Sequence, residues 1–341
     1  MDDLSPKERL FRVLQHKTVD RPPVICTGGM MNAAIVDVMK LSGQTLPAAH
    51  HDGGLMADLS EAVGQYTGFE NLGIPFCMTV EAEVLGSKID FGSLFCEPKI
   101  TQEKFPSVSQ VEFQDIAILK NSGRLHTVAE AGSLLAKSHP DIPVIGSLTG
   151  PISTAASIVD PITFLKELRK DRDHAHRVID YVSQFLSMYA ELLVENGASI
   201  IAIGDPTATG EILGPKMFEE YAVFYLNQII RVIHHMGVPV ILHICGDMKA
   251  VKHLIPKLES DTISTDALVN LRLLKEEFKD LITMGNLSTY LLQFGTVEKV
   301  AEQTEKLLAD GIDIISPACG LSTSSALSNI HALTQTVKES R

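Results

Sequence analysis

Short apolar runs rich in β-branched residues recur along the chain, and this recurrence is the strongest constraint on its fold. A run that is apolar throughout, rather than alternating, is typical of a strand buried on both faces in a parallel sheet. Apolar residues at helical spacing over 173–196 and 216–236 supply intervening segments. The eight predicted strands are 24–27, 74–80, 144–150, 199–205, 239–245, 262–266, 282–288 and 313–319.

Eight alternating β/α units predict an α/β fold of the single (β/α)8 TIM-barrel type. The 341 residues could also form two smaller domains, but no linker, low-complexity tract or strong repeat divides them, so one domain over 1–341 is expected. A helical extension over about residues 1–20 should precede the barrel, because Ser5, Pro6 and Glu8 form a helix start. The long segment 85–140 is expected to add hairpins or loops.

Charge and composition limit the partners and the compartment. The chain has 42 Asp+Glu against 29 Lys+Arg and a net charge of −13, which disfavours a nucleic-acid partner because such proteins need a basic face. The uncharged stretch 142–159 contains helix-breaking Gly and Pro, so no membrane span is expected. The acidic start lacks the apolar core of a secretory signal, and the five widely spaced cysteines do not suggest a disulfide framework. A cytoplasmic location is therefore predicted.

Several polar residues stand at the ends of predicted strands, and in a TIM barrel these ends converge on the catalytic face. His243 and Cys245 are two positions apart on the fifth strand, so their side chains face the same way. Cys319 ends the last strand and can supply a third soft ligand. A His, Cys, Cys set suits zinc and leaves one position open for chemistry. The alternative is a satisfied histidine with two buried thiols, and spacing alone does not decide between them.

Four further residues near the same strand ends are candidates, and three of them have a structural alternative. Asp266 is either a partner or weak fourth ligand of the metal, or a cap for the next helix. Asp205 either hydrogen-bonds substrate or a ligand histidine, or forms an Asp-Pro turn. Asn286 lies near the end of the seventh strand on the cofactor side. Met30 either lines an apolar cofactor pocket or packs in the core.

Other signals are structural or absent. Cys26, Cys77 and Cys96 have no partner spacing and are interpreted as structural thiols. Glu81 and Glu83 follow the second predicted strand. One of them could face the mouth while the other faces away, but a solvated pair is the more common outcome and is expected here. The chain has no GxxxxGK[ST] loop, GxGxxG fingerprint, HExxH helix or GxSxG elbow, which argues against common nucleotide-dependent and serine-hydrolase functions.

Several segments together carry a family resemblance over essentially the whole chain. The most specific segments are LHICG and the late PACG. The other segments are SPKERLFRVLQHKTVDRPPV, PFCMTVEAEVLG, IAIGDPTATGEILGPKMFEEY, MGNLST and GIDIISPACGLS. With these segments the chain resembles the uroporphyrinogen-decarboxylase superfamily and, within it, the zinc-dependent methylcobamide methyltransferases that methylate coenzyme M.

The resemblance implies that His243, Cys245 and Cys319 bind Zn²⁺, with Asp266 as an exchangeable ligand. It implies methyl transfer from a methylcobamide, carried by a corrinoid protein as partner, to a small thiol such as coenzyme M. Another thiol or tetrahydrofolate stays open as the acceptor, and a corrinoid-protein binding module with a structural zinc is the non-enzyme alternative. Decarboxylation of a porphyrinogen is disfavoured, because TGGMMNAA stands where the decarboxylases carry an arginine-rich stretch.

Overall fold

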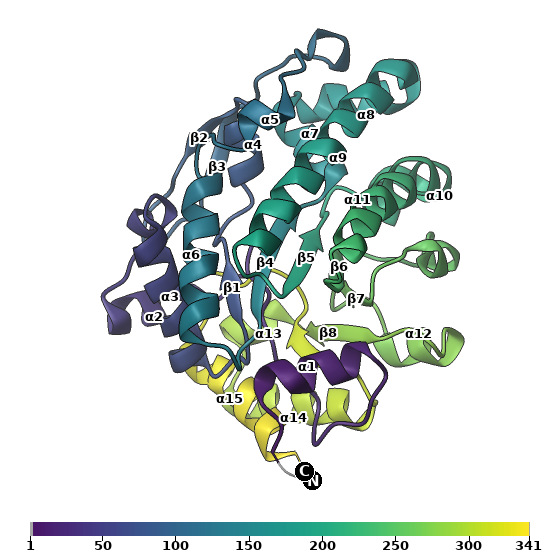
Figure 1. Cartoon of the computed structure of the whole chain (residues 1–341). Helices are drawn as coiled ribbons and strands as arrows, with labels where there is room; N and C mark the ends of the chain where they lie inside the picture. Colours follow the sequence, from purple (N-terminus) through teal and green to yellow (C-terminus); the bar gives the residue numbers. More distant parts are fainter. Residues whose placement is uncertain (1–2, 341) are drawn as a thin grey trace.

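A parallel sheet of seven strands, curled on itself and surrounded by helices, forms the centre of the computed structural model, which describes residues 3–340 (Figure 1). The strand order is β1-β4-β5-β6-β7-β8-β9, and every neighbouring pair is parallel. The strands are β1 (Leu72–Ile74), β4 (Val144–Thr149), β5 (Ile200–Gly204), β6 (Val240–Ile244), β7 (Thr262–Thr265), β8 (Thr283–Leu287) and β9 (Ile314–Pro317). Their residues are mostly buried, which explains the continuous apolar runs.

The first predicted strand closes this sheet into a barrel. Val24 forms a parallel bridge with Ile315 of β9, and the amide of Ile25 donates a hydrogen bond of 3.0 Å to the Ile315 carbonyl. On the other side, the amide of Glu70 donates to the carbonyl of Val24 over 2.9 Å, just before β1 begins. Segment 24–27 therefore lies between β9 and β1, and the predicted (β/α)8 fold is confirmed.

Side chains replace much of the backbone ladder where segment 24–27 meets the start of β1. Asn71 Oδ1 accepts a hydrogen bond from the Cys26 amide, and Asn71 Nδ2 donates to the Cys26 carbonyl, each over 2.8 Å. Glu70 Oε2 accepts from the Val24 amide over 3.1 Å. Asn71 is 2% exposed, so it satisfies two buried backbone groups that would otherwise have no strand partner. We call these contacts the closing seam.

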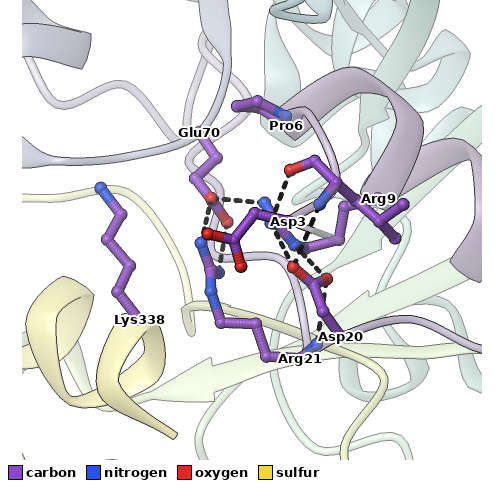
Figure 2. A pocket seen from close by; sticks show the side chains of 8 residues that line it. Asp3, Pro6, Arg9, Asp20, Arg21, Glu70 and Lys338 are labelled. Atoms are coloured by element: carbon purple, nitrogen blue, oxygen red, sulfur yellow. Dashed lines mark hydrogen bonds and ion pairs between the residues drawn. The ribbon is translucent and has the colours of Figure 1, made fainter. Parts of the chain in front are cut away.

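An ion-pair network holds the Glu70 end of the closing seam, and Figure 2 shows its geometry. Arg9 and Arg21 approach Glu70 Oε1 at 2.8 and 2.6 Å, and Arg9 also pairs with Asp20 at 2.7 Å. The hydrogen bond from Arg9 holds the pKa of Asp20 well below its usual range. These residues border a cavity of about 730 Å³ together with Lys338. Buried charges of both signs compensate one another here, as buried ion pairs require.

Helix α1 (Pro6–Leu14) covers the end of the barrel where the strands begin. Ser5 Oγ accepts from the Glu8 amide over 3.2 Å, which confirms the predicted helix start. The helix buries Leu10, Val13 and Leu14 in the same cluster as apolar side chains from the strands. This inner cluster also contains Ile25, Ile145, Ile200, Ile241, Ile282, Met284, Ile314 and Met31. The N-terminal helix is therefore part of the barrel's own core.

The remaining helices cover the outside of the barrel or follow its strand ends. Among residues 3–340, none of the helices has the length and apolar character of a membrane-spanning helix. The α-helices are α2 (Val36–Ser42), α3 (Gly53–Thr67), α4 (Val80–Val84), α5 (Ile116–Leu119), α6 (Leu125–Ser138), α7 (Pro151–Ile158), α8 (Pro161–Lys170), α9 (Arg172–Glu195), α10 (Gly210–Met217), α11 (Phe224–His235), α12 (Leu271–Glu277), α13 (Thr289–Phe294), α14 (Val297–Ala309) and α15 (Leu327–Glu339). Shorter helical turns are η1 (Ala48–His50), η2 (Val108–Gln110), η3 (Phe218–Val223) and η4 (Lys252–Lys257).

The second barrel strand, β1 (Leu72–Ile74), differs from the predicted strand at both ends. The predicted strand 74–80 is wrong in its bounds, because β1 ends at Ile74 and α4 begins at Val80. Phe76 and Cys77 lie in the loop between them and are buried, so the apolar pattern reflects core packing rather than a strand. The expected insertion is confirmed as an antiparallel hairpin of β2 (Lys88–Asp90) and β3 (Lys99–Gln102).

The closing seam generates a stability prediction. Replacing Asn71 with Leu leaves the buried Cys26 amide and carbonyl without partners, so the free energy of unfolding should fall by about 2–4 kcal/mol. Urea unfolding followed by circular dichroism measures the change. Asn121→Ala is the control, because Asn121 is exposed. An Asn71→Leu protein with the wild-type unfolding midpoint would show that the seam does not hold the barrel closed.

Candidate metal centre

Three soft ligand side chains meet at the mouth of the barrel, the end at which the strands finish. His243 lies on β6, Cys245 directly follows it, and Cys319 follows β9. His243 Nε2 is 3.3 Å from Cys245 Sγ, which is 3.5 Å from Cys319 Sγ. All three ligand atoms lie within 4.8 Å of one another, and within residues 3–340 this is the one cluster of possible metal ligands so close together.

The two thiols share a hydrogen bond that makes them ionise unequally. The pKa of Cys319 is lowered because its sulfur accepts a hydrogen bond from Cys245. The same hydrogen bond, followed by burial, raises the pKa of Cys245. Loss of one proton from the pair is therefore favoured, and loss of the second is disfavoured. A divalent cation would take the place of that proton, and two sulfurs with one imidazole nitrogen form a donor set that fits zinc.

The two aspartates predicted near the metal occupy different positions. Asp266 is half-buried at the end of β7, where its Oδ1 accepts from the Leu268 amide over 3.1 Å. It is outside the three-residue cluster, although its charge contributes to the raised pKa of Cys245. Asp205 is fully buried, and its carboxylate accepts from the amides of Ile152 and Ser153 at the start of α7. Burial raises the pKa of Asp205 to about 6.

Asn286 and Met30, both predicted on the cofactor side, lie against mouth loops. Asn286 Nδ2 donates to the carbonyls of Asp266 and Val269 over 2.9 and 2.8 Å, so it shapes the loop that carries Asp266. Met30 is half-buried and packs against the inner cluster. Its carbonyl oxygen would lie 2.6 Å from a Cβ at position 320, so only glycine fits directly after Cys319. Asn286 therefore holds the loop that bears Asp266, whereas the backbone of Met30 lies against the segment that bears Cys319.

Sequence reasoning missed Ser264, which contacts the candidate ligand histidine. Ser264 lies on β7 opposite His243 in the strand register, and its Oγ is 2.9 Å from His243 Nδ1. The available signal was a small polar residue within an otherwise buried strand. Its significance requires the β6–β7 register, which a single sequence does not supply.

Glu81 is buried, so the expectation of a solvated Glu81–Glu83 pair is wrong for it. Glu81 is 2% exposed and accepts from the Thr149 amide and hydroxyl over 2.7 and 3.1 Å. Burial raises its pKa to about 7. Glu83 instead pairs with the buried guanidinium of Arg124. Packing of α4 against α7 takes Glu81 out of water, and this contact is not visible in the sequence.

Comparison with known proteins identifies the class. Residues 5–340 match the uroporphyrinogen decarboxylase (URO-D) family, so the chain belongs to this family. A solved methyltransferase from Methanosarcina mazei superposes with a TM-score of 0.92 at 28% identity, covering 99% of both chains.

Two curated relatives refine this assignment within the family. The methylcobamide:CoM methyltransferase MtbA of Methanosarcina acetivorans is 34% identical over 340 residues, covering 99% of each chain. The methylcobamide:CoM methyltransferase MtaA of Methanosarcina barkeri is 29% identical, covering 98% of this chain and 97% of its own. These matches confirm the predicted enzyme class, a methyltransferase.

Burial of Glu81 generates a prediction about pH. Its folded pKa of about 7 exceeds the ordinary value of 4.5, so the native state binds this proton more tightly. The stabilisation of the native state by this proton is fully present below pH 4.5 and is lost as the pH rises through 7. Glu81→Gln should therefore reduce the loss of unfolding free energy between pH 5.5 and 8 by about 2 kcal/mol. Urea unfolding at several pH values tests this, with the exposed Glu112→Gln as the control. An unchanged pH dependence in Glu81→Gln would refute it.

Proposed function

We propose that this chain is a zinc-dependent methyltransferase that moves a methyl group from a methylated corrinoid, carried by a partner protein, to a small thiol such as coenzyme M. The observation that carries the proposal is the convergence of His243, Cys245 and Cys319 at the barrel mouth. The names of the full-length relatives, methylcobamide:CoM methyltransferases, support the donor and the acceptor.

The three side chains would bind the metal through two kinds of ligand atom. Cys245 and Cys319 supply two thiolates that neutralise a divalent cation, and His243 supplies a neutral nitrogen. Three protein ligands leave one position for the acceptor sulfur. Bound zinc would keep that sulfur as a nucleophilic thiolate at neutral pH. Both cysteines are half-buried, whereas His243 is 3% exposed, so the sulfurs form the accessible side of the site.

The proposed transfer balances without an external oxidant or reductant. The acceptor thiol loses its proton to solvent, and its sulfur forms the new bond to the methyl carbon. The methyl–cobalt bond breaks, and its electron pair remains on cobalt, which passes from Co(III) to Co(I). The protein supplies position and orientation for this displacement.

Four mouth residues complete the proposal. Asp266 would be an exchangeable fourth ligand that the acceptor displaces, while Asn286 and Met30 would lie on the cofactor side of the site. Asp205 would support the mouth indirectly, because its buried carboxylate holds the start of α7 through hydrogen bonds. We also propose a single domain and a cytoplasmic location.

Removal of either sulfur ligand tests the proposal. Purified wild-type protein should contain about one zinc per chain, and Cys245→Ala or Cys319→Ala should lose zinc and thiol methylation. The assay follows loss of methyl–cobalt absorbance from methylcobalamin with coenzyme M, 2-mercaptoethanol or tetrahydrofolate as acceptor. Cys96→Ala is the matched control, because Cys96 is exposed and lies outside the cluster. Full activity in metal-free Cys319→Ala protein would overturn the mechanism, and methylation of tetrahydrofolate alone would correct the acceptor.

Asp266→Asn tests the exchangeable ligand separately. The amide oxygen of Asn can still accept the Leu268 hydrogen bond, so the loop should keep its shape. Zinc content should remain about one per chain, because the other three ligands remain in place. X-ray absorption at the zinc edge should show one fewer oxygen ligand than in the wild type when no thiol is present. Identical zinc spectra for the two proteins would show that Asp266 does not bind the metal.

A further inference from the structure

The two ring nitrogens of His243 face different partners. Nε2 lies 3.3 Å from Cys245 Sγ, and Nδ1 lies 2.9 Å from Ser264 Oγ. His243 is 3% exposed and Ser264 is fully buried, so protein rather than bulk water surrounds this contact. The parallel register of β6 and β7 places the two residues directly opposite one another.

Metal binding through Nε2 determines the direction of the hydrogen bonds. A ligand nitrogen offers a lone pair, so the proton of the neutral ring resides on Nδ1 and is donated to Ser264 Oγ. The hydroxyl proton of Ser264 then needs its own acceptor. Met31 Sδ lies 3.9 Å from Ser264 Oγ, and Met31 is 2% exposed. His243, Ser264 and Met31 thus form a directed chain of two hydrogen bonds that ends on a thioether, a weak acceptor.

The adjacent residue on strand β7, Thr265, also carries a buried hydroxyl but makes no comparable contact. Thr265 is also fully buried, yet its Oγ1 has no hydrogen-bond partner. Successive side chains of a strand point to opposite faces, so Ser264 and Thr265 cannot both reach His243. The contact with His243 is therefore a property of position 264.

We propose that Ser264 is a positioning residue for the metal centre. It holds His243 in the Nδ1–H tautomer with Nε2 directed at the two sulfurs, and Met31 accepts the last proton of the chain. This inference rests on the proposed zinc function. A neutral hydroxyl accepts the Nδ1 proton without bringing a further negative charge to the side of the two thiolates.

Zinc affinity provides a test that does not depend on catalysis. Ser264→Ala should bind zinc about 10–100-fold more weakly in competition with a chromophoric chelator, as expected when the partner of a ligand histidine is lost. The Co²⁺-substituted variant should show shifted ligand-field bands, because the imidazole is no longer held in one orientation. Thr265→Val is the matched control, since it removes a buried hydroxyl without a partner from the same strand. It should bind zinc as the wild type does.

Met31→Leu gives a second, independent measurement if Ser264→Ala folds poorly. It removes the terminal acceptor while keeping a similar volume, so it should cause a smaller loss of zinc affinity than Ser264→Ala. The positioning role would be overturned if Ser264→Ala had the zinc affinity and Co²⁺ spectra of the wild type. If only Met31→Leu folds, the same result in that variant would overturn it. A wild-type protein that binds no zinc would overturn the proposed function itself. Zinc binding and thiol methylation in the wild type, with unchanged variants, would overturn only the role of Ser264.

Discussion

Closure of the barrel at segment 24–27 is the constraint on which the rest of the structure depends. The candidate ligands come from β6 and β9, which are separated in the sheet by β7 and β8. Their sulfur atoms approach to 3.5 Å because the sheet curves far enough for strand ends to meet across the mouth. The closing seam maintains this curvature through the side chains of Glu70 and Asn71 rather than through a full backbone ladder. A small number of buried hydrogen bonds at one seam thus supports the site at the other end of the strands.

The barrel interior changes from apolar to polar along its axis. Helix α1 and the isoleucines of the inner cluster fill the end where the strands begin. Met31 belongs to the same cluster and also lies 3.9 Å from Ser264, whose hydroxyl contacts His243. The apolar inner cluster therefore supports the polar site at the barrel mouth. Its closely packed side chains cannot rearrange freely, so they hold His243 in place. Function in this fold depends on the side chains at the strand ends, because the fold itself supports many chemistries.

Two buried carboxyl groups near the mouth hydrogen-bond to neighbouring segments of the barrel. Asp205 accepts from the first turn of α7, and Glu81 accepts from Thr149 at the end of β4. Both have raised pKa values because burial disfavours their charge. Perturbed carboxyls often mark functional sites. Here burial accounts for both raised pKa values, and the hydrogen bonds from Thr149 and Ser153 oppose it. The soft ligands, rather than the acids, distinguish this site.

Local patterns in the sequence were sufficient to predict the succession of strands, the helix capped by Ser5 and the common direction of the His243 and Cys245 side chains. Each depends on residues close together in the chain, where backbone periodicity alone specifies geometry. The end of β1 was misplaced because apolar residues buried in a loop have the same pattern as a buried strand. Burial of Glu81, the closing role of Asn71 and the Ser264–His243 contact depend on which distant segments pack together. Only the tertiary structure decided them, because strand register and helix packing set these distances and no local periodicity encodes them.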